Sequence, residues 1–194
     1  SKNDFDAIGL RALAHSELIT RLEVLDLSVS SLGDEDLKAL ATSPREGVLR
    51  ELYIYINDIG SEGLRALLES PLMTTLKKLH ASYNAPIGAG VRPLVEASPA
   101  FESLESLDLG RCEIGDHALV AMVSAPWVHN LDALDLDDND IRDEGFIALV
   151  NSPCLASLTS LRMWGNHVSA DGIQALVSVE LGTKPLKKLQ LYGN

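Results

Sequence analysis

The stretch Leu131–Pro153, LDALDLDDNDIRDEGFIALVNSP, contains one complete copy of a unit that recurs along the whole 194-residue chain. Aligned on their first leucine, the copies begin at positions 27 or 28 residues apart: Leu22, Leu49, Leu76, Leu104, Leu131, Leu158 and Leu186. A repeat of this length is typical of a solenoid, in which each unit packs only against its neighbours. The meaning of each residue therefore depends on its position in the repeat.

The first half of the repeat follows the frame L-x-x-L-x-L-x-x-N, as in Leu131–Asn139. Its alternating apolar residues predict a short strand with one buried face. A buried asparagine at the strand end can satisfy backbone groups of its own repeat and of the next. Ser30 and Cys112 replace this asparagine in two copies.

The second half predicts a helix. Acidic or hydroxyl residues such as Asp143 suit its first turn, where they cap free N–H groups and oppose the helix dipole. A column of alanines that includes Ala148 is expected where helix and sheet approach most closely. Proline ends five of these segments, at Pro44, Pro71, Pro99, Pro126 and Pro153. The sixth segment lacks this proline and is predicted to continue through Leu181.

The L-x-x-L-x-L-x-x-N/C frame, with the return I-G-x-E-G-x-x-A-L-x-x-S-P, resembles leucine-rich repeats of the ribonuclease-inhibitor-like subclass. It also looks like large bacterial families of such proteins. The resemblance implies an α/β solenoid with a parallel sheet on its concave face and helices on its convex face. Residues 1–194 are expected to form a single solenoid domain of about seven repeats. Neither end shows a polar capping unit, which suggests a fragment, or self-association through the uncapped ends.

Charge and composition narrow the class of partner. The net charge is −12, with 28 acidic against 16 basic residues, so the chain repels phosphate backbones and nucleic acid is not an expected partner. The sequence shows neither a long apolar run nor a signal peptide, which favours a cytoplasmic protein without membrane contact. Cys112 and Cys154 occupy different repeat positions and are expected to be free thiols in a reducing compartment.

The sequence lacks the motifs of common catalytic, nucleotide and metal sites, and we expect no catalytic residues, cofactor or metal. Asp135-x-Asp137-x-Asn139 resembles the start of a calcium loop, but Asp140 stands where such a loop requires glycine. Gly88 and Gly90 lack the third glycine of a phosphate-binding loop. The sequence around Asn84–Gly90 is interpreted as an accommodated insertion.

The residues between and after the strand leucines should project from the concave face. Twelve of them are candidate contact residues for a partner: Tyr53, Tyr55, His80, Tyr83, Asp108, Arg111, Asp135, Asp137, Asp138, Arg162, Trp164 and Tyr192. Exposed aromatic side chains near arginines are typical of binding hot spots, although aromatic residues also favour cross-strand packing. The central aspartates favour a basic protein, a basic peptide or a cation, or they form a solvated acidic strip.

These patterns predict a non-enzymatic scaffold that binds a protein or peptide. One alternative is a regulator similar to GTPase-activating proteins, in which Arg111 or Arg162 would act on a partner's phosphate site. Another is a targeting module of a larger enzyme.

Overall fold

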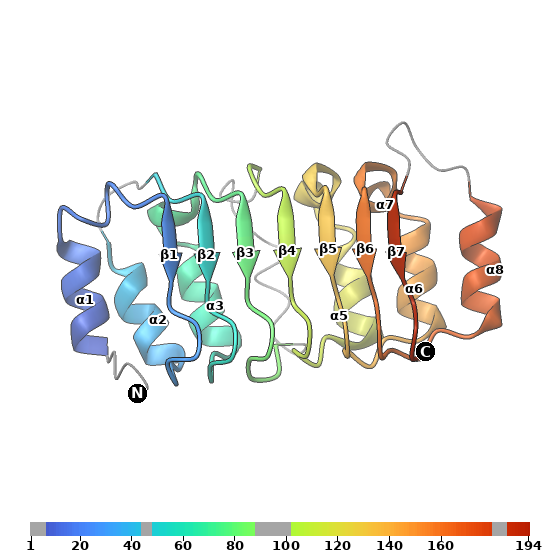
Figure 1. Cartoon of the computed structure of the whole chain (residues 1–194), viewed down its shortest axis with the longest axis horizontal. Helices are drawn as coiled ribbons and strands as arrows, with labels where there is room; N and C mark the ends of the chain where they lie inside the picture. The colour runs from blue at the N-terminus through green and yellow to red at the C-terminus, as the bar shows by residue number, and fades with distance from the viewer. Residues whose placement is uncertain (1–6, 44–47, 88–101, 180–185) are drawn as a thin grey trace.

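The structure is a computed structural model that describes residues 7–43, 48–87, 102–179 and 186–194 (Figure 1). Strands and helices alternate along the chain. The strands are β1 (Val24–Asp26), β2 (Glu51–Tyr53), β3 (Lys78–His80), β4 (Ser106–Asp108), β5 (Ala133–Asp135), β6 (Ser160–Arg162) and β7 (Lys188–Gln190). The main helices are α1 (Ala7–His15), α2 (Asp34–Ala41), α3 (Ser61–Leu68), α5 (Gly115–Met122), α6 (Asp143–Val150) and α8 (Ala170–Ser178).

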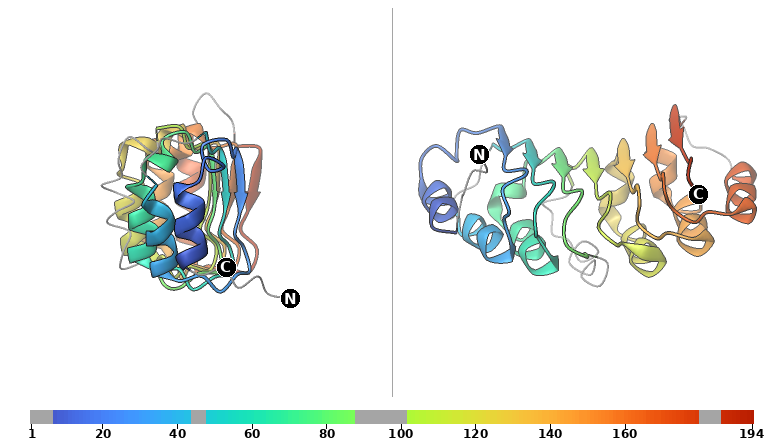
Figure 2. Two further views of the ribbon diagram at one scale, coloured as in Figure 1. Left: turned by 90° about the vertical axis from the view of Figure 1, so that its left-hand side faces the viewer. Right: turned by 60° about the horizontal axis from the view of Figure 1, so that its bottom comes forward.

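The seven strands form one parallel sheet in chain order. Their register places the central leucines opposite one another: Leu25, Leu52, Leu79, Leu107, Leu134, Leu161 and Leu189. Each step between neighbours equals one repeat of 27 or 28 residues, so the repeat predicted from the leucines is confirmed. The helices lie behind the sheet in a second layer, and the strands line the inner side of a shallow arc (Figure 2).

The core between the two layers is built from the apolar positions of the repeat. In the fifth copy Leu134, Leu136, Phe146 and Leu149 are all buried. Ala148, by contrast, is only half-buried. It nevertheless packs against this core beside the larger buried side chains of α6, and the closest approach of helix and sheet at the alanine column stays a prediction.

Prolines both end one helix and begin another. Pro71, Pro126 and Pro153 open short helices that the sequence did not predict: η1 (Pro71–Met73), η4 (Pro126–Asn130) and α7 (Pro153–Ser157). Proline has no N–H, so it is tolerated in a first helical turn, where that group would have no helical acceptor. Pro44 and Pro99 lie outside the described residues.

Helix α8 ends at Ser178, and Val179 has extended backbone dihedrals. The predicted continuation of this helix through Val179 is therefore wrong. Glu180 and Leu181, to which the prediction extended, lie outside the described residues.

The asparagine column connects neighbouring repeats. The Asn139 Nδ2 group donates to the carbonyl oxygens of Leu109 (2.8 Å) and Asp137 (3.1 Å). Its Oδ1 atom accepts from the backbone N–H groups of Cys112 (3.0 Å) and Ile114 (3.1 Å). The partners belong to its own repeat and to the preceding one, not to the following one as predicted.

The third and fourth repeats modify this pattern. Cys112 stands in the asparagine column, and its Sγ atom lies 3.3 Å from the carbonyl oxygen of Ala81. The preceding loop contains Pro86, which has no N–H to donate, and Ile87 N donates instead to the carbonyl oxygen of Cys112 (2.8 Å). A thiol suffices here because fewer backbone donors need an acceptor.

First-turn aspartates make a second connection, towards the following repeat. The Asp116 Oδ1 atom accepts from the backbone N–H groups of Arg142 (2.7 Å) and Gly145 (3.0 Å), at the start of the next helix. Asp34 and Asp143 reach the next repeat in the same way. The predicted capping role of these carboxylates is thus exercised on the neighbouring helix.

One column of the repeat has left-handed backbone throughout. The residue before the asparagine column has a φ between 51° and 78° in all seven repeats: Val29, Ile56, Tyr83, Arg111, Asp138, Gly165 and Gly193. A residue with a Cβ pays roughly 1–2 kcal/mol in this conformation, and β-branched residues such as Val29 and Ile56 tolerate it least.

Candidate functional site

The sheet register places the first predicted column of contact residues side by side. The aligned residues that follow the central leucine are Asp26, Tyr53, His80, Asp108, Asp135, Arg162 and Gln190. In β2 to β6 the central leucine is buried, and the residue on each side of it is only half-buried. These flanking side chains therefore project from the concave face, as predicted.

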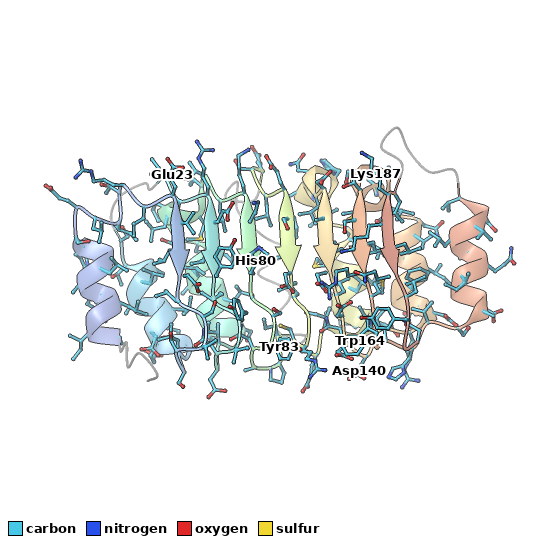
Figure 3. All side chains as sticks on the ribbon, viewed as in Figure 1. Glu23, His80, Tyr83, Asp140, Trp164 and Lys187 are labelled. Carbon is cyan, nitrogen blue, oxygen red and sulfur yellow. The ribbon has the colours of Figure 1, made fainter. Side chains whose placement is uncertain are left out.

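Nine of the twelve predicted contact residues surround a single hollow of about 240 Å³ on this face. Its lining combines aromatic and charged side chains: Tyr83, Asp108, Arg111, Asp135, Asp137, Asp138, Arg162, Trp164 and Tyr192, together with Ser82 and Gly110. Figure 3 shows Tyr83 and Trp164 at the edge of the solenoid where the strands end, with His80 farther up the sheet.

Arg162 and Asp137 form the centre of the hollow. The guanidinium group of Arg162 donates to Asp137 Oδ2 through both Nε (3.0 Å) and Nη2. The backbone N–H of Trp164 donates to Asp137 Oδ1 at 2.7 Å. Asp137 is only 7% exposed, so this carboxylate is committed to holding Arg162 and the Trp164 backbone in place.

Asp135 lies on the other side of the same guanidinium, with Oδ2 3.0 Å from Arg162 Nε. Burial raises the pKa of Asp135 to about 6, and the negative charges of Asp108 and Asp137 act in the same direction. The backbone N–H of Asp137 and the charge of Arg162 oppose this rise. Another positive charge that enters the hollow would stabilise the ionised form of this carboxyl group and lower its pKa.

Asp108 faces the hollow from the neighbouring strand. Its Oδ2 atom accepts from Ser82 Oγ (3.0 Å) and lies 3.6 Å from Nδ1 of His80. Its Oδ1 atom accepts from the Gly110 backbone N–H at 3.1 Å. Neighbouring polar groups hold Asp108, and none of its contacts among the described residues is with an arginine, unlike those of Asp137 and Asp138.

Arg111 lies between aromatic rings at the edge of the hollow. Its guanidinium carbon is 4.8 Å from the centroid of Tyr83 and 5.8 Å from that of Trp164. Its Nε atom is 2.8 Å from Asp138 Oδ2. Trp164 in turn lies 5.5 Å from Tyr192, centroid to centroid. Tyr83, Trp164 and Tyr192, which we call the aromatic wall, thus lie around a cation of the chain itself.

The remaining three predicted residues lie outside this hollow. Tyr53 and His80 stack with their centroids 4.6 Å apart and their planes 3° from parallel. The Tyr53 hydroxyl donates to Glu51 (2.8 Å), and Glu51 also accepts from Lys78 (2.7 Å). This cluster is satisfied internally, which fits the alternative interpretation of cross-strand packing. Tyr55 is half-buried beside it.

Small residues that the sequence analysis did not select leave room for the larger ones. A Cβ at Gly165 would lie 1.9 Å from Asp138 Oδ1, and one at Gly193 would lie 2.9 Å from Trp164 Nε1. Gly110 keeps the space above Asp108 open, since a Cβ there would lie 3.5 Å from its Oδ1. In the sequence, the signal for these positions was a glycine in a column otherwise occupied by residues with side chains.

A wider depression of about 700 Å³ lies nearer the opposite edge of the solenoid. Within the described part of the chain its lining includes Lys77, Lys78, Ser106 and Ala133 and no aromatic side chain. Lys77 pairs with Glu105, and Lys78 pairs with a neighbouring carboxylate. With its main cations already paired and no aromatic wall, it is a weaker candidate than the aromatic hollow.

Other kinds of site have little support in the described residues. Across 7–43, 48–87, 102–179 and 186–194, histidine, cysteine and carboxylate side chains form no group that could hold a metal ion. Burial raises the pKa of the Cys112 and Cys154 thiols to about 12, which disfavours the reactive thiolate. In this part of the chain, no helix combines the length and apolar character needed to cross a membrane.

Comparison with known proteins identifies the repeat. A family model described as Leucine Rich repeat matches residues 20–41, 48–68, 102–123, 129–150 and 154–177, together more than half of the chain. No curated protein matches the chain. Among solved structures, the crystal structure of the TLR13–ssRNA13 complex is similar, with 22% identity and a TM-score of 0.49. The alignment covers 97% of this chain and 27% of that one. The ribonuclease-inhibitor-like subclass stays a prediction.

Proposed function

Because this chain belongs to the leucine-rich repeat family, whose members are generally non-enzymatic scaffolds, we propose that it binds a protein or peptide through its concave face. Residues 1–194 would act as one solenoid domain, and the two buried cysteines suit a reducing compartment such as the cytoplasm. The observation that carries the proposal is the hollow in which exposed aromatic rings adjoin carboxylates.

The charges of the hollow favour a basic segment. Four carboxylates line it against two guanidinium groups, so its formal charge is negative by two. Asp137 and Asp138 contact Arg162 and Arg111, respectively. Asp135 shares the Arg162 guanidinium with the more buried Asp137, and Asp108 contacts His80 rather than either arginine. Asp108 and Asp135 are therefore the carboxylates best placed to receive a lysine or arginine of the partner, with the aromatic wall beside them.

Nucleic acid is a weaker candidate because of charge alone. The chain carries a net charge of −12, and the hollow adds to this field where a ligand would approach. The fold itself does not exclude nucleic acid, since the TLR13 structure is a complex with ssRNA13.

The regulatory alternative needs an arginine that is free to reach a partner's phosphate. Arg162 is bonded to two aspartates, and Arg111 lies against two rings and Asp138. Neither arrangement favours this alternative.

A role as the targeting module of a larger enzyme is compatible with the proposed binding face. Self-association through the ends stays a prediction; Ile8 and Val177 are the most exposed large apolar side chains of the described residues.

The proposal is tested by selecting a random peptide library, displayed on phage, against the full 194-residue chain. Selected peptides are expected to contain lysine or arginine. The double variant Asp108→Asn/Asp135→Asn should weaken their binding by about tenfold or more. The matched control Glu144→Gln/Asp171→Asn removes two carboxylates from the first turns of α6 and α8 and should leave binding unchanged. Selection of no peptide, or equal loss in both variants, would contradict the proposal.

A further inference from the structure

Three apolar side chains lie exposed on the left-handed column of the first three repeats. Val29 is 48% exposed, Ile56 is 46% exposed and Tyr83 is 48% exposed. Their φ angles are 56°, 53° and 56°. They lie in consecutive repeats at the edge where strands lead into helices, which Figure 3 marks with the label of Tyr83. We call these three residues the apolar rim.

The residue types of the apolar rim are the opposite of those that favour folding stability at these positions. Glycine and aspartate occupy the same column at Gly165, Gly193 and Asp138, and these residue types adopt left-handed backbone most readily. Val29 and Ile56 are β-branched, for which positive φ is strained. Their exposure also means that they contribute little burial in return. Backbone strain retained at an exposed apolar residue is a reason to look for a function.

We propose that the apolar rim is a docking surface for a protein partner whose contact patch is apolar at its centre and carries lysine or arginine around it. This inference rests on the proposed function and deepens it. The hollow would receive a basic side chain, and the apolar rim would bury the hydrophobic part of the same partner. Apolar contact area surrounded by complementary charge is the usual anatomy of a protein interface.

Charge on the strand-to-helix edge supports a basic surround. The loops that follow the strands on this edge carry the carboxylates Asp58, Glu113, Asp138 and Asp140. Two arginines, Arg111 and Arg142, accompany them, and the helices behind begin with further acidic residues. On the opposite edge, Arg21, Arg50, Lys77 and Lys187 stand just before strands together with Glu23, Glu105 and Asp132, so positive and negative charges there nearly balance. A partner with basic residues is therefore drawn to the edge that bears the apolar rim.

The first test measures stability, and it needs no partner. The double variant Val29→Asn/Ile56→Asn places a residue that tolerates positive φ at both positions. Its melting temperature is expected to rise by a few degrees. The control Val24→Asn makes the same exchange at an exposed residue of β1, without positive φ, and should not raise it. A fall in the melting temperature of the double variant would show that the rim side chains serve packing, and would overturn the inference.

The second test measures binding of the peptides selected on the wild-type chain. Loss of the rim should weaken binding about tenfold or more in Val29→Asn/Ile56→Asn, and Val24→Asn should bind like the wild type. Peptides that bear basic residues without apolar ones should be insensitive to the rim variant. If Asp108→Asn/Asp135→Asn weakens binding and the rim variant does not, the proposed function holds and this inference fails. If neither double variant weakens binding, both fail.

Discussion

A Cβ atom at Gly145 would lie 2.6 Å from Oδ1 and 3.0 Å from Cα of Asp116, in the helix of the preceding repeat. The Gly145 backbone N–H donates to the same Oδ1 atom at 3.0 Å. We predict that Gly145→Ala lowers the free energy of unfolding by about 1–3 kcal/mol, because α5 and α6 must separate to admit the methyl group. Urea denaturation measures this change.

Gly33→Ala is the matched control, because a Cβ there would have no neighbour closer than 3.9 Å. We expect it to change stability by no more than about 0.5 kcal/mol. Equal losses in the two variants would mean that the helix-to-helix contact is not what requires glycine at position 145.

Asn139→Ala should lower the free energy of unfolding more than most substitutions outside the apolar core. The side chain is fully buried and satisfies two N–H groups and two carbonyl groups of the backbone. Leaving these groups without a partner should cost about 2–4 kcal/mol. Asn151→Ala removes an exposed asparagine with one bond to the carbonyl of Ile147 and should cost well under half as much in the same denaturation experiment.

Of the three arginine–aspartate pairs of the hollow, those of Asp137 and Asp138 should contribute unequally to stability. Asp137→Asn removes the charge that holds Arg162 and is expected to lower stability by about 1–2 kcal/mol, since the carboxylate is buried although the arginine is partly exposed. Asp138→Asn breaks a more exposed pair with Arg111 and should cost no more than about 0.5 kcal/mol. The reverse order would place the centre of the hollow at Arg111.

Asp135→Asn should stabilise the protein at pH 8 by about 1–2 kcal/mol. Burial raises the pKa of Asp135 from 3.8 to about 6, so the folded state binds this proton more tightly than the unfolded chain does. The wild type therefore loses stability as the pH rises from about 4 to about 6, and the variant does not. Thermal unfolding at pH 8 and pH 4 checks this: the gain should shrink towards the lower pH. A gain independent of pH would not come from this proton.

Much of the fold could be predicted from the sequence because one frame is repeated seven times. The leucine spacing predicts the strand register, and the register places Asp108 beside Asp135 without further information. The exposed columns follow from the alternation of side chains along a strand. Three of the nine predicted contact residues in the hollow, Asp108, Asp135 and Arg162, lie within strands and follow from this alternation; the other six lie just beyond the strand ends.

Other features depend on side-chain and backbone geometry that the alignment of the repeats does not reveal. The direction of the Asn139 bonds depends on which side of the strand end the amide turns to. The pairing of Arg162 with Asp137 across one repeat depends on the rotamer of a long side chain. The left-handed backbone of Ile56 could not be predicted, because β-branched residues rarely adopt that conformation. The glycines Gly165 and Gly193 carried the available signal at that position.

The asparagine and aspartate connections described above share a short reach. The amide of Asn139 spans 25 to 30 residues and the carboxylate of Asp116 spans 26 to 29, in each case to an adjacent repeat. The bonding of an interior repeat is therefore complete once its two neighbours are present. The length of such a chain can therefore change in steps of one whole repeat. A duplication or loss of 27 or 28 residues adds or removes one entire set of hydrogen-bond donors and acceptors. Evolution can accordingly lengthen or shorten the surface offered to a partner by whole repeats without redesigning the core.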